Sequence, residues 1–151
     1  MKAELVNIFV QAATTVFEKE LNISLSRHAA VRKSKPVPGR PVCIVLGLAG
    51  NVRGQVVYAV DDTFAMDIAP HMIPNTLPSK LRQLMGSAVG EMGNMITGQA
   101  TIALAGEEKS IEITPPTVIT GDNILVNFVE LPTVSLQMLS EMGVLEINIA
   151  I

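Results

Sequence analysis

A serine, a glutamate and an asparagine are spaced so that they fall on one side of a predicted helix. They are Ser87, Glu91 and Asn94, and the residues around them favour helix. Residues three and four apart are neighbours on a helix surface, so the three side chains form a short polar stripe. A carboxylate can hold a cation, and an amide can orient a water molecule by donating and accepting hydrogen bonds. Such a stripe could attach to a partner and position a nucleophile without covalent chemistry of its own.

The stripe also has a purely structural interpretation. A carboxylate beside an amide is common on a solvated helix face, and a serine within a helix is often only a tolerated small residue. Three glycines, Gly86, Gly90 and Gly93, flank the stripe, although a glycine costs a helix interior about 0.5–1 kcal/mol relative to alanine. They indicate either close packing of the helix on another element or a low surface that lets a partner's backbone approach the stripe.

The composition indicates one domain with an aliphatic core. The chain has 151 residues, of which 48% are hydrophobic and 3% aromatic, and this length is enough to bury the core of one domain. No stretch approaches the ~20 apolar residues of a membrane-spanning helix. The first residues, Met1–Leu5, lack the basic and apolar blocks of a secretory signal. We therefore expect a single domain over residues 1–151, located in the cytoplasm.

Other kinds of chemistry have little support in the sequence. The net charge of −3 and the scarcity of aromatic residues argue against nucleic acid as a partner. His28 and His71 are far apart, and neither has a histidine or cysteine neighbour at metal-ligand spacing. The single cysteine, Cys43, lies in an apolar run and is interpreted as a small buried hydrophobe. We expect no metal and no cofactor on this chain.

The first part of the chain predicts a helix followed by a hairpin. Apolar residues recur at helical spacing over residues 3–21. The basic, proline-containing segment 27–39 then indicates a weak strand and an exposed loop. Two β-branched runs, 42–48 and 55–60, flank a glycine-containing turn and are typical of an antiparallel hairpin.

Two further helices are predicted in the middle of the chain. A short one is capped by Asp61 or Asp62, and the prolines that follow limit its length. The second runs from about Lys80 to the low 100s, is capped by Ser79, and carries the polar stripe. A broad apolar face of this central helix is formed by Leu81, Met85, Ala88, Val89, Met92, Met95 and Ile96.

The rest of the chain predicts strands that complete a sheet. Strand-like runs cover residues 110–114, 117–120, 123–129 and 145–151, with a hairpin turn at Gly121–Asp122. The last run alternates apolar and polar residues, and we expect it at a sheet edge, where it could pair with another copy of the chain. The fold class is α/β (α+β): a mixed, largely antiparallel sheet with the long central helix and the N-terminal helix packed on it.

The pattern around the stripe resembles the CheC/CheX family of chemotaxis phosphatases. In that family an acidic residue or a serine precedes Glu-x-x-Asn, and a proline follows a little over twenty residues later. Here Ser87, Glu91 and Asn94 match in place, and Pro115 and Pro116 lie one or two residues short of the usual spacing. The order of the elements fits a CheC-like fold as well, so the resemblance covers most of the chain and is most specific over residues 80–121.

The number of signature copies favours one branch of this family. CheC-like members often carry two copies, one in each of two pseudo-symmetric halves. Glu4 and Asn7 have the same spacing, but no serine or aspartate precedes them at the right distance, so we count one copy. A single central copy makes the chain more similar to the CheX members, which work as homodimers joined through their sheets.

The resemblance implies hydrolysis of an aspartyl phosphate on a CheY-like response-regulator receiver domain. Glu91 would pair with the receiver's active-site lysine, and Asn94 would orient a water molecule for in-line attack. Ser87, Gly90 and Gly93 would lie at the partner, and the Mg²⁺ would belong to the receiver. Phosphoryl transfer leaves a protein little covalent work, so positioning and electrostatics suffice.

Two other interpretations stay open. Related folds occur in flagellar switch proteins, so the chain could be a non-catalytic adaptor for a receiver or a switch protein, with Glu91 and Asn94 as contact residues only. It could also be a structural dimerisation domain that binds no receiver.

Overall fold

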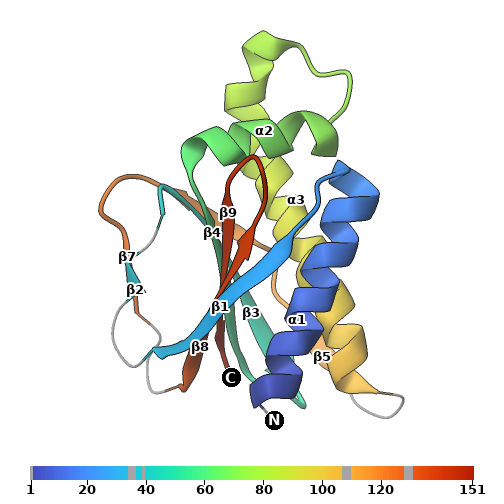
Figure 1. Ribbon diagram of the computed structural model, residues 1–151, viewed down its shortest axis with the longest axis vertical. Coiled ribbons are helices and arrows are strands. Elements are labelled where there is room, and N and C mark those ends of the chain that lie inside the picture. The colour runs from blue at the N-terminus through green and yellow to red at the C-terminus, as the bar shows by residue number, and fades with distance from the viewer. Residues whose placement is uncertain (1, 34–36, 39, 107–109, 128–130) are drawn as a thin grey trace.

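An antiparallel sheet with helices on one face forms the body of the protein (Figure 1). The computed structural model describes residues 2–33, 37–38, 40–106, 110–127 and 131–151. The elements in chain order are α1 (Lys2–Val16), the π-helical turn η1 (Phe17–Leu21), β1 (Ser26–Lys33), β2 (Val37–Pro38), β3 (Val42–Gly50), β4 (Gly54–Val60), α2 (Asp62–Met72), α3 (Pro78–Ala105), β5 (Ile111–Ile113), β6 (Thr117–Thr120), β7 (Leu125–Val126), β8 (Thr133–Leu139) and β9 (Val144–Ala150).

The main sheet has the strand order β1-β8-β9-β4-β3-β5, and β6 also pairs with β3. Every strand pair among the described residues is antiparallel. Strands β5 and β6 follow one another along the same side of β3, and residues 114–116 interrupt the pairing between them. The short strands β2 and β7 form a separate two-stranded sheet. The α/β fold class with its largely antiparallel sheet is confirmed.

The core lies between the sheet and the helices. Alternate residues of β3, β4, β8 and β9 point toward α1 and α3, which lie side by side on that face, while α2 crosses one end (Figure 1). The predicted apolar face of the central helix is confirmed: five of its members are buried, and Leu81 and Met95 are partly buried against the core. Among the described residues, no helix is both long enough and apolar enough to cross a lipid bilayer.

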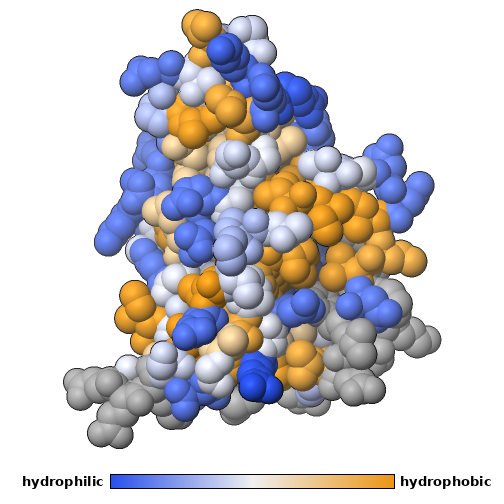
Figure 2. Space-filling model, turned by 180° about the vertical axis from the view of Figure 1, so that it is seen from behind, coloured by the Kyte–Doolittle hydropathy of each residue, from blue (hydrophilic) through white to orange (hydrophobic). Residues whose placement is uncertain are grey.

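The opposite face of the sheet carries a smaller apolar cluster. Cys43 is buried there with Val57 and Ala59, which confirms the interpretation of this cysteine as a small hydrophobe. Ile124 and Val126 pack onto this cluster, so the segment that contains β7 covers part of the sheet. A large hydrophobic area is visible on the right of Figure 2, on the side of the molecule where β7 lies.

The predicted position of the last strand is wrong. Strand β9 lies inside the sheet between β8 and β4, whereas the sheet ends at β1 and at β5. No strand is predicted at residues 133–139, yet β8 forms there and pairs with β9. Its signal was present, because Val134, Leu136 and Met138 alternate with polar residues and are buried in the core.

Two local predictions are also wrong. Helix α3 begins at Pro78 with Leu77 as its N-cap, so Ser79 is inside the helix rather than its cap. Proline suits the first helical position because its φ is already helical and its missing N–H would have no partner there. The hairpin turn predicted at Gly121–Asp122 does not join paired strands, because β6 pairs with β3 and β7 pairs with β2.

The other predicted elements are confirmed. The N-terminal helix, the hairpin of β3 and β4, and the short helix α2 all form, and Asp61 takes the N-cap position of α2. The side chain of Asp61 makes no capping hydrogen bond, because its carboxylate contacts Arg40 instead. Parts of the loop predicted within 27–39 and of the run 123–129 lie outside the described residues.

Substitution of two glycines of α3 by alanine tests how closely this helix approaches the sheet. A Cβ atom at Gly93 would lie 2.9 Å from Ile44 Cγ2 and 3.2 Å from Tyr58 Cδ2, whereas one at Gly98 would meet no atom within 4 Å. We expect Gly93→Ala to lower the free energy of unfolding by about 1–2 kcal/mol through overpacking. Gly98→Ala should raise it by up to about 1 kcal/mol through helix propensity. Urea unfolding followed by circular dichroism measures both, and equal effects would contradict this packing.

Candidate functional site

The structure brings the three residues of the polar stripe together on one side of α3. Ser87 and Glu91 are exposed and Asn94 is half-buried. The opposite side of the helix packs on the core, and α1 and α2 flank it. With a rise of about 1.5 Å per residue, the stripe is ~10 Å long. A side chain on this stripe therefore has a fixed position on a helix that is held from three sides.

The proline of the sequence pattern lies beside the stripe in space. A Cβ atom at Gly90 would be 3.3 Å from Val118 Cγ2 and 3.6 Å from Pro116 Cγ, so the segment that leads into β6 packs on α3 at this glycine. Two hydrogen bonds hold Thr114, which lies between β5 and β6, against Gly47 of β3. The N–H of Gly47 donates to Thr114 Oγ1 at 2.7 Å, and the N–H of Thr114 donates to the carbonyl of Gly47 at 3.0 Å. Residues more than twenty positions apart thus form one surface.

The glycines beside the stripe serve packing within the protein. Gly90 and Gly93 are both buried, and Gly93 faces Ile44, Leu46 and Tyr58 of the sheet. Their burial favours the first of the two alternatives drawn from the sequence, close packing of the helix. A role of these two glycines at a partner is therefore indirect, because they let α3 lie close to the sheet. Ser87 remains a candidate contact residue, since its side chain is exposed.

The polar ends of Glu91 and Asn94 are available for an external ligand. Within the part of the chain that the structure describes, no hydrogen bond or ion pair engages either side chain, whereas Thr97 one turn further on bonds both Tyr58 and the carbonyl of Gly93. A free carboxylate can accept hydrogen bonds from a cationic group, and a free amide can both donate and accept. The pair can therefore hold a cation and orient a water molecule three residues away.

Apolar side chains lie at both ends of the stripe. Leu84 is 36% exposed and Ile102 is 76% exposed. Their spacing of seven and eleven residues from Glu91 places them on the same side of the helix. Both apolar residues are therefore accessible, together with the polar pair, to a partner that docks on this side of the helix. Among the described residues, no cluster of histidine, cysteine, aspartate and glutamate could hold a metal ion.

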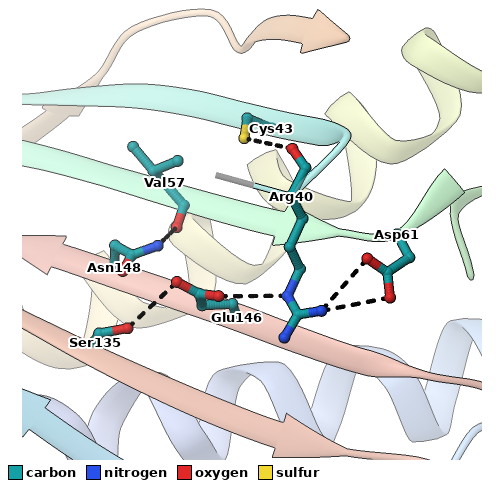
Figure 3. A network of polar contacts seen from close by, with 7 residues as sticks. All are labelled: Arg40, Cys43, Val57, Asp61, Ser135, Glu146 and Asn148. Atoms are coloured by element: carbon teal, nitrogen blue, oxygen red, sulfur yellow. Dashed lines mark hydrogen bonds and ion pairs between the residues drawn. The ribbon is translucent and has the colours of Figure 1, made fainter. Parts of the chain in front are cut away.

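A second polar cluster lies on the opposite face of the sheet and belongs to the scaffold (Figure 3). The guanidinium of Arg40 contacts Glu146 at 3.3 Å and Asp61 at 3.4 Å, and Ser135 Oγ donates to Glu146 Oε1 at 3.4 Å. The thiol of Cys43 donates to the carbonyl of Arg40, and burial raises the pKa of this thiol. A protonated, buried thiol is a poor nucleophile. The contacts of Arg40 with Glu146 and Asp61 join β9 to the residues that flank β3 and β4, so this cluster stabilises the scaffold.

Sequence reasoning missed a bidentate ion pair that joins α2 to the start of α3. Nη1 and Nη2 of Arg82 donate to Oδ1 and Oδ2 of Asp62 at 2.5 and 2.9 Å. The two residues are twenty positions apart, so no helical spacing links them. The pair fixes the first turns of α3, a short distance before the stripe.

Comparisons with known proteins identify the family of this chain. A family model described as chemotaxis phosphatase CheX matches residues 42–138. The CheY-P phosphatase CheX of Thermotoga maritima is 32% identical over 82 residues, which are 54% of this chain and 53% of that protein. The match thus spans about half the length of this curated relative.

Solved structures share the fold over nearly the whole chain. The chemotaxis protein CheX of Desulfovibrio desulfuricans superposes with a TM-score of 0.86 at 24% identity, over 97% of each chain. The CheX-CheY-BeF3-Mg²⁺ complex of Borrelia burgdorferi contains a chain that matches with a TM-score of 0.80 at 23% identity, over 96% of each chain. At these identities the similarity establishes the fold.

The ion pair between Arg82 and Asp62 predicts a pH-dependent contribution to stability. The hydrogen bond from Arg82 lowers the pKa of the Asp62 carboxyl below its usual value of 3.8. A carboxyl whose pKa is lower in the folded state stabilises the fold above its unfolded pKa, and this contribution is lost as the pH falls through the folded pKa. We expect Arg82→Gln to raise the pKa of Asp62 and to reduce stability at pH 7 but not at pH 2.

Carboxyl titration by NMR and urea unfolding at the two pH values check this expectation. Arg53→Gln is the matched control, because Arg53 is an exposed arginine in the turn between β3 and β4. An unchanged pKa of Asp62 in Arg82→Gln would contradict the pairing.

Proposed function

Because this chain belongs to the CheX family of chemotaxis phosphatases, we propose that it hydrolyses the aspartyl phosphate of a CheY-like response-regulator receiver. The observation that carries the proposal is the pair formed by Glu91 and Asn94, which lie on the outer side of one packed helix and bond to no other group among the described residues. The Thermotoga relative is named a CheY-P phosphatase, and the Borrelia relative was solved with CheY, BeF3 and Mg²⁺. These names support the same class of substrate for this chain.

Glu91 anchors the receiver in this proposal. Its exposed carboxylate accepts a charge-assisted hydrogen bond from the active-site lysine of the receiver, which sits beside the phosphoryl group. Such bonds are shorter and stronger than neutral ones. Leu84 and Ile102, which are exposed on the same side of the helix, extend the contact with the receiver beyond the ion pair.

Asn94 positions the attacking water. Its amide lies one turn from Glu91, so docking of the glutamate brings it next to the phosphoryl group. The water attacks phosphorus in line with the bond to the aspartyl oxygen, that bond breaks, and the products are inorganic phosphate and a free aspartate carboxylate. The amide accepts a hydrogen bond from the water and donates one toward a phosphoryl oxygen, so it fixes the direction of attack. The Mg²⁺ that neutralises the phosphoryl oxygens is held by the receiver.

The contact surface extends beyond the two central residues. Ser87 is exposed one turn before Glu91 and fits against the receiver as a small polar residue. Gly90 and Gly93 act from within, because they keep α3 close to the sheet and to Pro116. The exposed residues thus contact the receiver, and the buried glycines set the position of α3.

Substitutions of the two central residues separate anchoring from catalysis. We expect Asn94→Ala to lower kcat about 100-fold with little change in KM, because it removes the group that orients the water. Glu91→Ala should raise KM at least about tenfold, since a hydrogen bond to a charged group contributes about 1.5–3 kcal/mol. The measurement is release of inorganic phosphate from a CheY-like receiver phosphorylated with acetyl phosphate and then freed from it.

Gln99→Ala is the matched control for this experiment, because Gln99 is an exposed amide on the same helix, eight residues beyond Glu91. Full activity of Asn94→Ala would contradict its role with the water. If the wild-type protein binds the phosphorylated receiver without accelerating release, the adaptor interpretation replaces the phosphatase. If it does neither, the domain has a structural role only.

We also propose that the protein forms a homodimer through its sheet. Among the described strands, β6 pairs only with β3, and residues 117–120 carry no charge, whereas charged residues usually protect a sheet edge from pairing. Ile119 on β6 is 44% exposed and Leu125 on β7 is 68% exposed. These features support a second copy of the chain as the partner of this side.

Light scattering after gel filtration measures the mass directly. We expect twice the mass of the chain for the wild-type protein and the mass of a single chain for Ile119→Lys. Ile102→Lys introduces the same charge at an exposed isoleucine of α3 and should keep the double mass. A single-chain mass of the wild-type protein at every concentration would overturn the dimer.

A further inference from the structure

A pair of buried hydroxyl groups connects the middle of the sheet to α3. Tyr58 on β4 and Thr97 on α3 are both fully buried, and their hydroxyl oxygens are 2.8 Å apart. Thr97 Oγ1 also lies 2.8 Å from the carbonyl oxygen of Gly93, to which it donates a hydrogen bond. The surroundings are apolar, so these bonds have no water to compete with them.

The direction of the two hydrogen bonds follows from the number of protons. Thr97 has one hydroxyl proton, and it is donated to the carbonyl of Gly93. The bond to Tyr58 must therefore be donated by the phenol. The result is a chain in which the phenol of Tyr58 donates to the hydroxyl of Thr97, which donates to the carbonyl of Gly93. Bonds in such a chain polarise and strengthen one another.

This chain of bonds ends at the turn of α3 that carries Asn94. Gly93 precedes Asn94 directly, and Thr97 follows it by three residues. At the other end, Tyr58 is paired with Ile44 on one side and with Ile147 on the other, so it sits on an interior strand. The link therefore runs from the most constrained part of the sheet to the backbone next to the proposed site.

Apolar contacts lack the directionality of hydrogen bonds, so they constrain the rotation of α3 less sharply than the link from Tyr58 does. The buried side chains that face the sheet include Met85 and Met92, and methionine adapts its shape to irregular gaps. The side chains of a helix end about 5–6 Å from its axis. A rotation of about 10° would therefore move the amide of Asn94 by ~1 Å, and a misplacement of that size can cost about 100-fold in rate.

We propose that Tyr58 and Thr97 are positioning residues for Asn94, which fix the rotation of α3 about its axis through their hydrogen bonds. The proposal rests on the function proposed above, because it assigns to the pair the orientation of that site. Burial raises the pKa of Tyr58 well above its usual range, so the phenol keeps its proton and the link persists across the physiological range of pH.

The competing explanation is that the two hydroxyls only satisfy each other in the core. A buried pair of this kind adds little net stability compared with apolar groups of the same shape. In that case, removal of a hydroxyl would change the free energy of unfolding but not the chemistry of the folded protein. The two explanations therefore differ in kcat at equal fold and equal receiver binding.

Substitutions that remove a hydroxyl and keep the shape test the proposal. We expect Tyr58→Phe and Thr97→Val each to lower kcat for phosphate release about tenfold at unchanged KM. The kcat of the double variant should be no lower than that of the less active single variant, because both residues act through one link. Thr97→Ser keeps the hydroxyl and should retain the wild-type kcat. Thermal unfolding of each variant identifies any that fails to fold, and Tyr58→Phe, the smallest change, then carries the test.

Thr101→Val is the matched control. Thr101 is also buried on α3, and its Oγ1 donates to the carbonyl of Gly98 at 2.9 Å, but among the described residues it has no bond to the sheet. It loses the same kind of bond within the helix one turn further on, so its kcat should stay at the wild-type value. A tenfold loss in Thr101→Val would attribute the effect to the helix alone and overturn the link.

A second measurement is independent of phosphatase activity. The side-chain amide of Asn94 gives two NMR cross-peaks whose positions report its surroundings. We expect these peaks to move in Tyr58→Phe and Thr97→Val and to keep their positions in Thr101→Val. If the wild-type protein accelerates no receiver's decay, the proposed phosphatase fails and the peaks alone decide the positioning. The positioning role would be overturned if the Asn94 peaks did not move in Tyr58→Phe and Thr97→Val, or if both variants kept the wild-type kcat.

Discussion

The close approach of α3 to β3 and β4 is the constraint on which the rest of the structure depends. At its nearest point the helix has no side chain, because Gly93 faces Ile44, Leu46 and Tyr58. This contact sets the distance between α3 and the sheet. That distance decides which residues of the helix are buried and which reach solvent. Gly90 then touches Pro116, Asn94 is half-buried, and Glu91 stands clear of the surface. A larger residue at position 93 would lift the helix and change all of these at once.

The sequence predicts those elements whose signal lies within one segment. The apolar period of α3 and the hairpin of β3 and β4 are local patterns, and both are confirmed. The order of strands is not local, because pairing between distant segments depends on the whole sheet. The last strand was misplaced for this reason, and its polar residues added to the error. Glu146 and Asn148 suggest a solvated face, yet both are buried on the side that Arg40 covers.

The candidate site was predicted in part. The spacing of Ser87, Glu91 and Asn94 fixes their common side, since an α-helix allows no other arrangement. The contacts that support them are long-range, as in the pairing of Tyr58 with Thr97 across 39 positions. A threonine within a helix and a tyrosine within a strand are ordinary at their own positions. Their relation exists only once the helix has docked on the sheet.

The candidate site of this protein lies on the exposed side of a helix. A convex helix cannot enclose a small molecule, so it has no means of shielding a reacting phosphoryl group from bulk water by itself. In the proposed reaction, the walls, the metal and the lysine must all come from the receiver. Selectivity is thus built in at the level of assembly: an acyl phosphate without a surrounding receiver meets only an amide and a carboxylate in open water. Under the proposed function, substitutions of exposed residues such as Leu84 and Ile102 would suit a new receiver, while the buried supports stay unchanged.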